Sequence, residues 1–199
     1  WDFGGEVIAG LDVAEMGVDF TVLTVAVKDA QTGRCRVVAI ESWGKMDLMP
    51  TVARTVPLLA FWKVDRISVD ATGIGSGVYS RLEELKREGK ISCQVLAFKG
   101  GLSPNKEIER ERFLNLKAQS YWSLRKLFED GKVSIPKHRD LISQLSKMKW
   151  ELVSSQKIRI RDPGTKMCDT SEEKSPDFSD SLNIACWSIK KLTPLFNIR

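Results

Sequence analysis

The chain has 199 residues, enough to bury one sizeable hydrophobic core but not several. Its four cysteines show no C-x-x-C spacing and its single histidine is His138, which argues against a structural zinc site and fits a reducing compartment. No apolar run reaches the roughly 18 residues that a membrane span needs, and nothing resembles a signal peptide. We therefore expect one domain over residues 1–199 with no membrane partner. Because the chain begins at Trp1 rather than Met, we also expect it to be a fragment of a longer protein.

The net charge of +5 is unevenly distributed along the chain. From Lys99 to Lys166 there are 16 Lys and Arg against 8 Asp and Glu, whereas the rest of the chain has 15 against 18. An acidic core that carries a basic arm suits a polyanionic partner. Charge alone leaves a second interpretation open, in which solvated helix faces happen to be basic.

The first half of the chain predicts three strands followed by alternating helices and strands. The first strand is a near-continuous apolar run, which is typical of a central strand, and a turn at 29–33 joins the next two into an antiparallel meander. Pro57 weakens or kinks the first helix. The expected elements are strands at 6–14, 20–28 and 34–43, a helix at 47–62, a strand at 66–70, a helix at 76–88 and a strand at 91–98.

This order of elements, βββαβαβ, is characteristic of the ribonuclease H-like fold. We therefore expect an α/β domain with a mixed five-stranded sheet. The strands alternate with helices after the meander, so the helices should cover both faces of the sheet.

The second half of the chain predicts helices and a basic β-hairpin. A Gly- and Pro-containing loop at 99–105 opens it, and Lys99 and Lys106 flank that loop. The last helix should begin with Ser175 as N-cap and Pro176 at its first position. The expected elements are helices at 115–130 and 138–148, hairpin strands at 149–152 and 157–161, a polar segment at 162–174 and a final helix to about residue 191.

One face of the second hairpin strand carries Lys157, Arg159 and Arg161. These side chains, with Lys99 and Lys106, are candidate contacts to the phosphates of DNA. Charged residues also protect exposed sheet edges from aggregation, so the pattern fits either role.

Four acids are the candidate metal ligands and catalytic residues. Asp12 lies near the end of the first predicted strand, Asp70 ends the strand at 66–70, and Asp177 and Asp180 lie three residues apart on the last helix, hence on one face. Oxygen ligands alone point to Mg²⁺ or Mn²⁺, and carboxylates from three elements can hold two ions about 3.5–4 Å apart for phosphodiester hydrolysis. Asp177 also fits a purely structural role, because the helix macrodipole favours acids in a first turn.

The glycine-rich stretch after Asp70 has a simpler explanation than phosphate binding. Residues 72–77 read Thr-Gly-Ile-Gly-Ser-Gly, with no following Lys, so they do not form a Walker A loop. We assign them chiefly to a tight turn from strand to helix.

Taken together, these segments resemble the nuclease domain of phage large terminases. The acidic motifs that match are Gly10-Leu11-Asp12-Val13-Ala14, Val69-Asp70-Ala71-Thr72-Gly73 and Ser175-Pro176-Asp177-Phe178-Ser179-Asp180-Ser181-Leu182. Residues 115–122 and Gln144 to Trp150 resemble the region that links them. Each motif alone is weak, but the likeness extends through nearly the whole chain and is specific in combination.

The resemblance implies a metal-dependent endonuclease that cuts concatemeric viral DNA during genome packaging in the host cell cytoplasm. It matches Asp12, Asp70 and Asp180 to metal-binding acids, Asp177 to a position that varies in the family, and the basic hairpin to an element that guides double-stranded DNA. The partners that it implies are an N-terminal packaging ATPase domain of the same chain, the small terminase subunit and the portal of the procapsid. No motor motif is present in these residues, so we expect no ATPase activity from them.

Two alternatives from other classes stay open. One is a catalytically silent DNA-binding module, in which the acids are helix caps and turn residues. The other is half of an actin-like or sugar-kinase-like ATPase, which shares the fold and the Gly-x-Asp strand end but needs two such domains. Metal-dependent plasmid nicking separates the nuclease from both alternatives, and nucleotide binding identifies the ATPase half.

Overall fold

The computed structural model describes residues 4–14, 19–44, 46–161 and 175–187. In the first half of the chain the predicted elements all form, within a few residues of the expected ends. They are β1 (Gly5–Asp12), β2 (Phe20–Asp29), β3 (Cys35–Gly44), α1 (Leu48–Phe61), β4 (Arg66–Asp70), α2 (Ile74–Arg87) and β5 (Gln94–Phe98). Pro57 lies inside α1, which continues past it.

The main sheet is mixed and has the strand order β5-β4-β1-β2-β3-β6. The β1–β2 and β2–β3 pairs are antiparallel, and β1–β4 and β4–β5 are parallel. The predicted five-stranded sheet is therefore wrong by one strand, because β6 (Val133–Ser134) pairs parallel with the start of β3. Two residues are too few to show the alternation by which a strand is recognised in a sequence.

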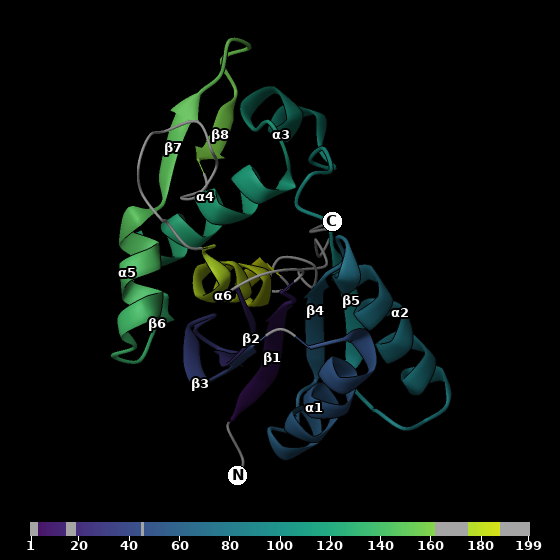
Figure 1. The fold of residues 1–199 in the computed structure, drawn as a ribbon. Helices are drawn as coiled ribbons and strands as arrows, with labels where there is room; N and C mark the ends of the chain where they lie inside the picture. The colour runs from purple at the N-terminus through teal and green to yellow at the C-terminus, as the bar shows by residue number, and fades with distance from the viewer. Residues whose placement is uncertain (1–3, 15–18, 45, 162–174, 188–199) are drawn as a thin grey trace, which may run out of the picture.

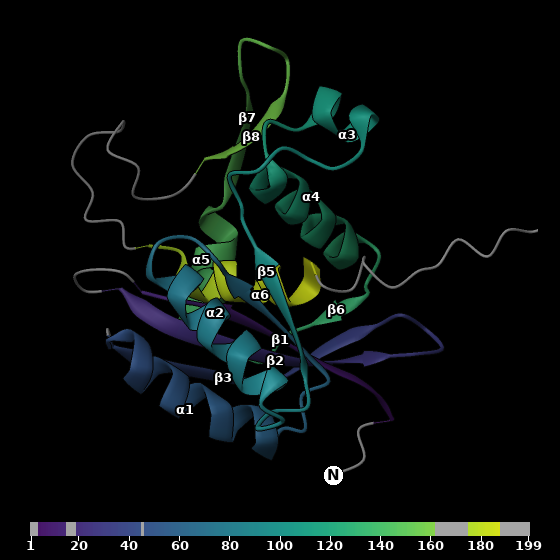
Figure 2. The ribbon, with the colours of Figure 1, turned by 90° about the vertical axis from the view of Figure 1, so that its right-hand side faces the viewer.

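Helices cover both faces of the sheet, as predicted (Figures 1 and 2). On one face α1 and α2 pack on side chains such as Val7, Ala9 and Leu11 of β1. On the other face Ile8 of β1 joins residues of α6 (Asp177–Trp187), α4 (Leu116–Glu129) and α5 (Arg139–Lys147). Successive residues of a strand point to opposite faces, so Gly10 and Asp12 belong to the α6 side.

Apart from β6 and α6 itself, the second half of the chain forms the layer above α6 in Figure 1. Its helix α3 was not predicted; it is a short, charged helix with no buried residue, so it lacks an apolar stripe. The hairpin strands pair antiparallel as a separate two-stranded sheet. The elements are α3 (Glu107–Arg112), α4 (Leu116–Glu129), β6, α5 (Arg139–Lys147), β7 (Lys149–Leu152) and β8 (Ile158–Arg161).

The central helix α6 is buried on nearly every side. Of its 11 residues, only Asp180 and Trp187 keep intermediate exposure, since the sheet lies below and α4 and α5 lie above. The predicted polar segment 162–174 and the predicted end of this helix near residue 191 lie outside the described residues. Within the described ranges, no helix is long and apolar enough to cross a membrane.

Candidate metal centre

Asp12 and Asp70 end two neighbouring parallel strands. In the β1–β4 pair Leu11 lies opposite Val69, so the next residue of each strand is an aspartate at the same edge of the sheet. Alternation places both on the face that α6 covers, because Val69 and Leu11 belong to the core on the opposite face. The sequence prediction that these two acids meet is consistent with this register.

Helix α6 is held directly against β1 at Gly10. A Cβ atom there would clash with the backbone of Ser181 and would come within 2.9 Å of the Cα of Ala185, so only glycine allows this approach. The Ser181 hydroxyl donates to the Gly10 carbonyl at 2.9 Å and lies 2.9 Å from the hydroxyl of Thr24. These contacts fix α6, and with it Asp180, over the ends of β1 and β4.

Asp180 has two partners on α4 that the sequence analysis did not assign. The ammonium of Lys117 lies 3.1 Å from its Oδ2, and the hydroxyl of Tyr121 donates to its Oδ1 at 2.7 Å. Lys117 and Tyr121 are four residues apart and so share one face of α4. The same Tyr121 oxygen lies 2.9 Å from the hydroxyl of Ser179, which ties α4 to the start of α6.

Asp177 is oriented differently from the other three acids. It is buried, and its Oδ2 accepts a 2.8 Å hydrogen bond from the backbone N–H of Phe20, the first residue of β2. Burial raises the pKa of Asp177, while hydrogen bonds from Ser175 and Phe20 oppose that rise. Its carboxylate is therefore already engaged in holding α6 to β2, which fits the structural alternative for this residue.

The pKa of Asp12 is affected by its burial and by the other acids. Burial raises the pKa of Asp12 well above its usual range, and the carboxylates of Asp180, Asp70 and Asp177 raise it further. Lys117 opposes this effect. A desolvated carboxylate among other carboxylates is stabilised when a cation binds between them.

The donor set suits a hard divalent cation, since all four side chains offer oxygen and none offers sulfur or imidazole nitrogen. As placed, however, no three Asp, Glu, His or Cys side chains in the described part of the chain form a ready set of ligands for one ion. Asp180 faces Lys117 and Tyr121 instead. The residues thus fit Mg²⁺ or Mn²⁺ in chemistry and charge.

The turn after Asp70 packs tightly, as the sequence indicated. Gly73 has φ +51°, and Gly75 lies so close to the carbonyl of Asp70 that a side chain there would clash with it. The backbone N–H of Thr72 donates to the Asp70 carboxylate at 3.1 Å. The glycines thus bring α2 against the end of β4 and help to hold the Asp70 side chain.

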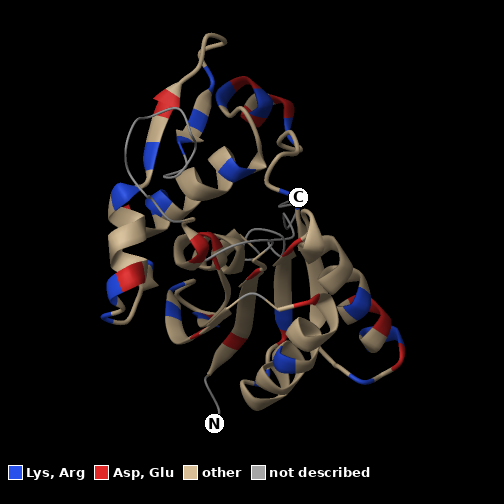
Figure 3. Ribbon diagram, in the orientation of Figure 1, with Lys and Arg blue, Asp and Glu red and all other residues tan. Residues whose placement is uncertain are grey.

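Figure 3 shows Lys and Arg in blue on α4, α5 and the hairpin, in the layer above α6. Lys99, Lys106 and Arg161 are exposed and Lys157 is half-buried. Arg159 is exposed but pairs with Glu151 across the hairpin, and its Nε donates to Oε1 of Glu151 at 2.9 Å. Alternation is as predicted, because Ile158 faces inward and Arg159 faces solvent.

A family model described as terminase RNase H-like domain matches residues 9–189 of this chain. That match includes the end of β1 with Asp12, the whole of β4 and the whole of α6. The chain belongs to this family. No curated protein was found to match.

Solved structures with the fold of this terminase domain come from phage large terminases. The nuclease domain of the large terminase subunit gp2 of bacterial virus Sf6 matches with a TM-score of 0.74 and 18% identity, over 94% of this chain and 90% of that one. The large terminase nuclease of thermophilic phage G20c with bound magnesium matches with a TM-score of 0.65 and 19% identity, over 94% and 83%. The large terminase nuclease domain of Thermus phage P74-26 matches with a TM-score of 0.60 and 18% identity, over 90% of this chain and 77% of that one. The predicted ribonuclease H-like fold is thereby confirmed.

The sequence of this terminase domain contains a pattern that could have indicated Lys117 and Tyr121 as site residues. Lys117 and Tyr121 stand one helical turn apart in the 115–122 segment, flanking the buried Ala118 and Ser120. A cation and a phenol on a face that is otherwise buried require a polar partner. Which acid they meet depends on how α4 crosses α6, and that information is absent from local spacing.

Proposed function

We propose that this terminase domain is a Mg²⁺- or Mn²⁺-dependent endodeoxyribonuclease. The observation that carries the proposal is geometric: Asp12 and Asp70 end neighbouring parallel strands at one edge of the sheet, and α6, which bears Asp180, packs against β1 at Gly10. Such a cluster is electrostatically unfavourable by itself and favourable around divalent cations.

In this proposal Asp12, Asp70 and Asp180 would hold two divalent cations, the number that two-metal phosphodiester hydrolysis uses. When bound, the ions supply activation of a water molecule and stabilisation of the leaving oxygen of a phosphodiester. Tyr121 orients the Asp180 carboxylate through its hydrogen bond, and Lys117 balances its charge when no cation is present. Asp177 positions α6 through Phe20 and assists only indirectly.

Similar structures support divalent metal use. A mutant of the Sf6 nuclease domain was solved with manganese and, in another crystal, with calcium, and the G20c nuclease was solved with magnesium. For this chain we extend the proposal to cutting of concatemeric viral double-stranded DNA in the host cytoplasm, beside a packaging ATPase domain, the small terminase subunit and the portal. The basic excess from Lys99 to Lys166 supports the DNA part of it.

Supercoiled plasmid nicking tests the proposal. The wild-type domain should nick plasmid in Mn²⁺ and not in EDTA, and Asp70→Asn should reduce the rate by several orders of magnitude because the change keeps the size and removes the charge that the ions need. Asp140→Asn, an exposed acid on α5, is the matched control and should cut at the wild-type rate. Wild-type nicking by Asp70→Asn would refute the assignment of Asp70.

A second candidate, the catalytically silent DNA-binding module, is favoured by one observation. Asp180 is paired with Lys117, and no ready three-ligand set exists among the described residues. Mn²⁺ titration followed by thermal unfolding decides between the two. A rise in melting temperature that Asp12→Asn and Asp70→Asn both abolish supports the nuclease, whereas no Mn²⁺-dependent rise in the wild type supports the silent module.

A further inference from the structure

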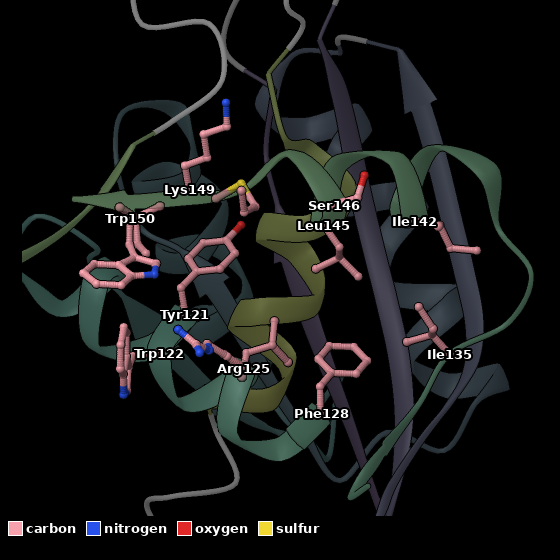
Figure 4. Close-up of a pocket in the computed structure, with 13 residues that line it drawn as sticks. Tyr121, Trp122, Arg125, Phe128, Ile135, Ile142, Leu145, Ser146, Lys149 and Trp150 are labelled. Atoms are coloured by element: carbon pink, nitrogen blue, oxygen red, sulfur yellow. The ribbon is translucent and has the colours of Figure 1, made fainter. Parts of the chain in front are cut away.

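A cavity of about 570 Å³ lies beside the metal centre, between α4, α5 and the hairpin. Figure 4 shows Trp122, Trp150 and Arg125 gathered at one end of it and Phe128, Ile135 and Ile142 at the other. Tyr121 also lines the cavity, and its hydroxyl donates to Asp180, so the cavity adjoins the catalytic acids directly.

The tryptophan end of this cavity is an aromatic platform with cations on it. Trp150 is 48% exposed, and its ring meets Trp122 edge to face with centroids 5.4 Å apart. The guanidinium of Arg125 lies 4.9 Å from the Trp122 ring centroid, and that of Arg112 lies 5.2 Å from it. Leaving an indole half exposed is unfavourable in water, so a flat apolar ligand that covers it would be stabilised.

The charge around the platform identifies the ligand class. The lining includes Arg125 and Lys149 and, within the described chain, no acidic residue. Arg125 forms an ion pair with Glu129, but neither Arg112 nor Lys149 has an acidic partner among the described residues. Exposed aromatic rings flanked by cations bind single-stranded nucleic acid, because each base stacks on a ring while the backbone phosphates meet the cations.

We propose that the platform formed by Trp122, Trp150, Arg112 and Arg125 binds unpaired bases of a DNA strand next to the metal centre. This inference rests on the proposed function for its substrate, DNA, and adds that the bound DNA is locally single-stranded. Trp150 is the stacking residue, since it is the exposed one. Arg112 and Arg125 brace Trp122 and meet the phosphates of the same strand.

Binding in EDTA tests the inference without any cleavage. We compare three labelled probes by fluorescence anisotropy: oligo(dT), a blunt duplex and a forked duplex with an unpaired arm. Trp150→Ala should weaken oligo(dT) and forked DNA by roughly 5- to 150-fold, the effect of losing one stacked base, and should leave the blunt duplex unchanged. The slope of affinity against salt should not change, because no charge is removed.

Two variants control for fold and for loss of aromatic surface in general. Trp150→Phe keeps a stacking face and should keep most of the affinity for oligo(dT). Phe61→Ala removes a ring that is 70% exposed on α1, at the far end of the molecule from the hairpin in Figure 1, and should change nothing.

The outcomes separate this inference from the proposed nuclease activity. Selective loss of oligo(dT) binding supports the platform even if plasmid nicking by the wild type fails. Equal weakening of all three probes by Trp150→Ala, or no weakening of any, overturns the inference even if nicking succeeds. If none of the probes binds more weakly, Trp150 does not contact DNA.

Discussion

The hydroxyl of Tyr121 donates a 2.7 Å hydrogen bond to the carboxylate of Asp180. The bond joins α4 to α6 and fixes one oxygen of the acid, while Lys117 meets the other oxygen. A carboxylate that is held in this way loses less conformational freedom when it binds a cation. The consequences of this contact and of the packing around it can be measured.

Tyr121→Phe removes only the hydroxyl and keeps the buried ring. We expect about a 10- to 100-fold lower apparent Mn²⁺ affinity in the nicking assay, the usual cost of losing a group that orients a ligand. Higher Mn²⁺ should recover much of the rate. Tyr79→Phe on α2, the other tyrosine of the chain, is the matched control. Equal Mn²⁺ dependence in the two variants would show that Tyr121 only fills space.

Asp12→Asn should stabilise the metal-free protein, and the gain should grow with pH. Burial and the neighbouring carboxylates hold the folded-state pKa of Asp12 above the unfolded value of about 3.9. The folded wild type therefore binds more protons than the unfolded chain, and it loses stability as pH rises from about 3.9 through the raised pKa. Asparagine does not titrate, so the difference in melting temperature should be smallest near pH 4 and largest above the folded-state pKa.

Added Mn²⁺ should reverse that ranking at neutral pH. The wild type gains stability from the bound ion and Asp12→Asn gains little. Asp140→Asn is the control and should follow the wild type in both series. A melting temperature of Asp12→Asn that stays below the wild type in EDTA at neutral pH would contradict the account of a repulsive cluster.

Gly10→Ala should separate α6 from β1. The added methyl group collides with the backbone of Ser181 and Ala185, which cannot move without shifting the whole helix. We expect a loss of about 1–3 kcal/mol in the free energy of unfolding, as for other overpacked cores, and a larger fractional loss of nicking because Asp180 moves with the helix. Gly44→Ala is the control, since nothing lies within 4 Å of a Cβ at that position. Similar unfolding energies for the two variants would count against this packing.

The basic hairpin should contribute to DNA affinity through charge. Lys157, Arg159 and Arg161 are replaced together by Ala. The slope of log affinity against log salt concentration should fall by the amount expected for two phosphate contacts, at about 0.9 each, and not for three. The reason is that Arg159 already pairs with Glu151. Affinity is measured on blunt duplex DNA over a salt series in EDTA.

The control for the hairpin removes equal charge elsewhere. The control replaces three basic residues at or just after the end of α2, Lys86, Arg87 and Lys90, by Ala. This change should leave the salt slope of DNA affinity unchanged. If both triple variants lower the slope equally, binding follows net charge. If the hairpin variant leaves it unchanged, the hairpin is a charged sheet edge, and Lys99 and Lys106 become the next candidates.

Local pattern was sufficient for most of the fold. Alternation and apolar runs predicted β1 to β5 and the hairpin, and helical spacing predicted α1, α2 and α4, because each of these elements is long enough to show its period. The two-residue β6 and the six-residue α3, with Ile108 as its only apolar residue, carry no such period, and both were missed. The acids at the ends of β1 and β4 also followed from sequence, since parallel neighbours end at the same edge.

The tertiary structure alone decided what each acid contacts. Asp177 and Asp180 lie one turn apart on one helix, yet Asp177 accepts from the backbone of Phe20 and Asp180 binds Lys117 and Tyr121. The difference arises because α6 is enclosed, with β2 near its first residue and α4 across its middle. Composition and periodicity describe one element at a time, whereas these contacts depend on the crossing of α4 over α6 and on the close approach at Gly10, which are properties of the packed chain.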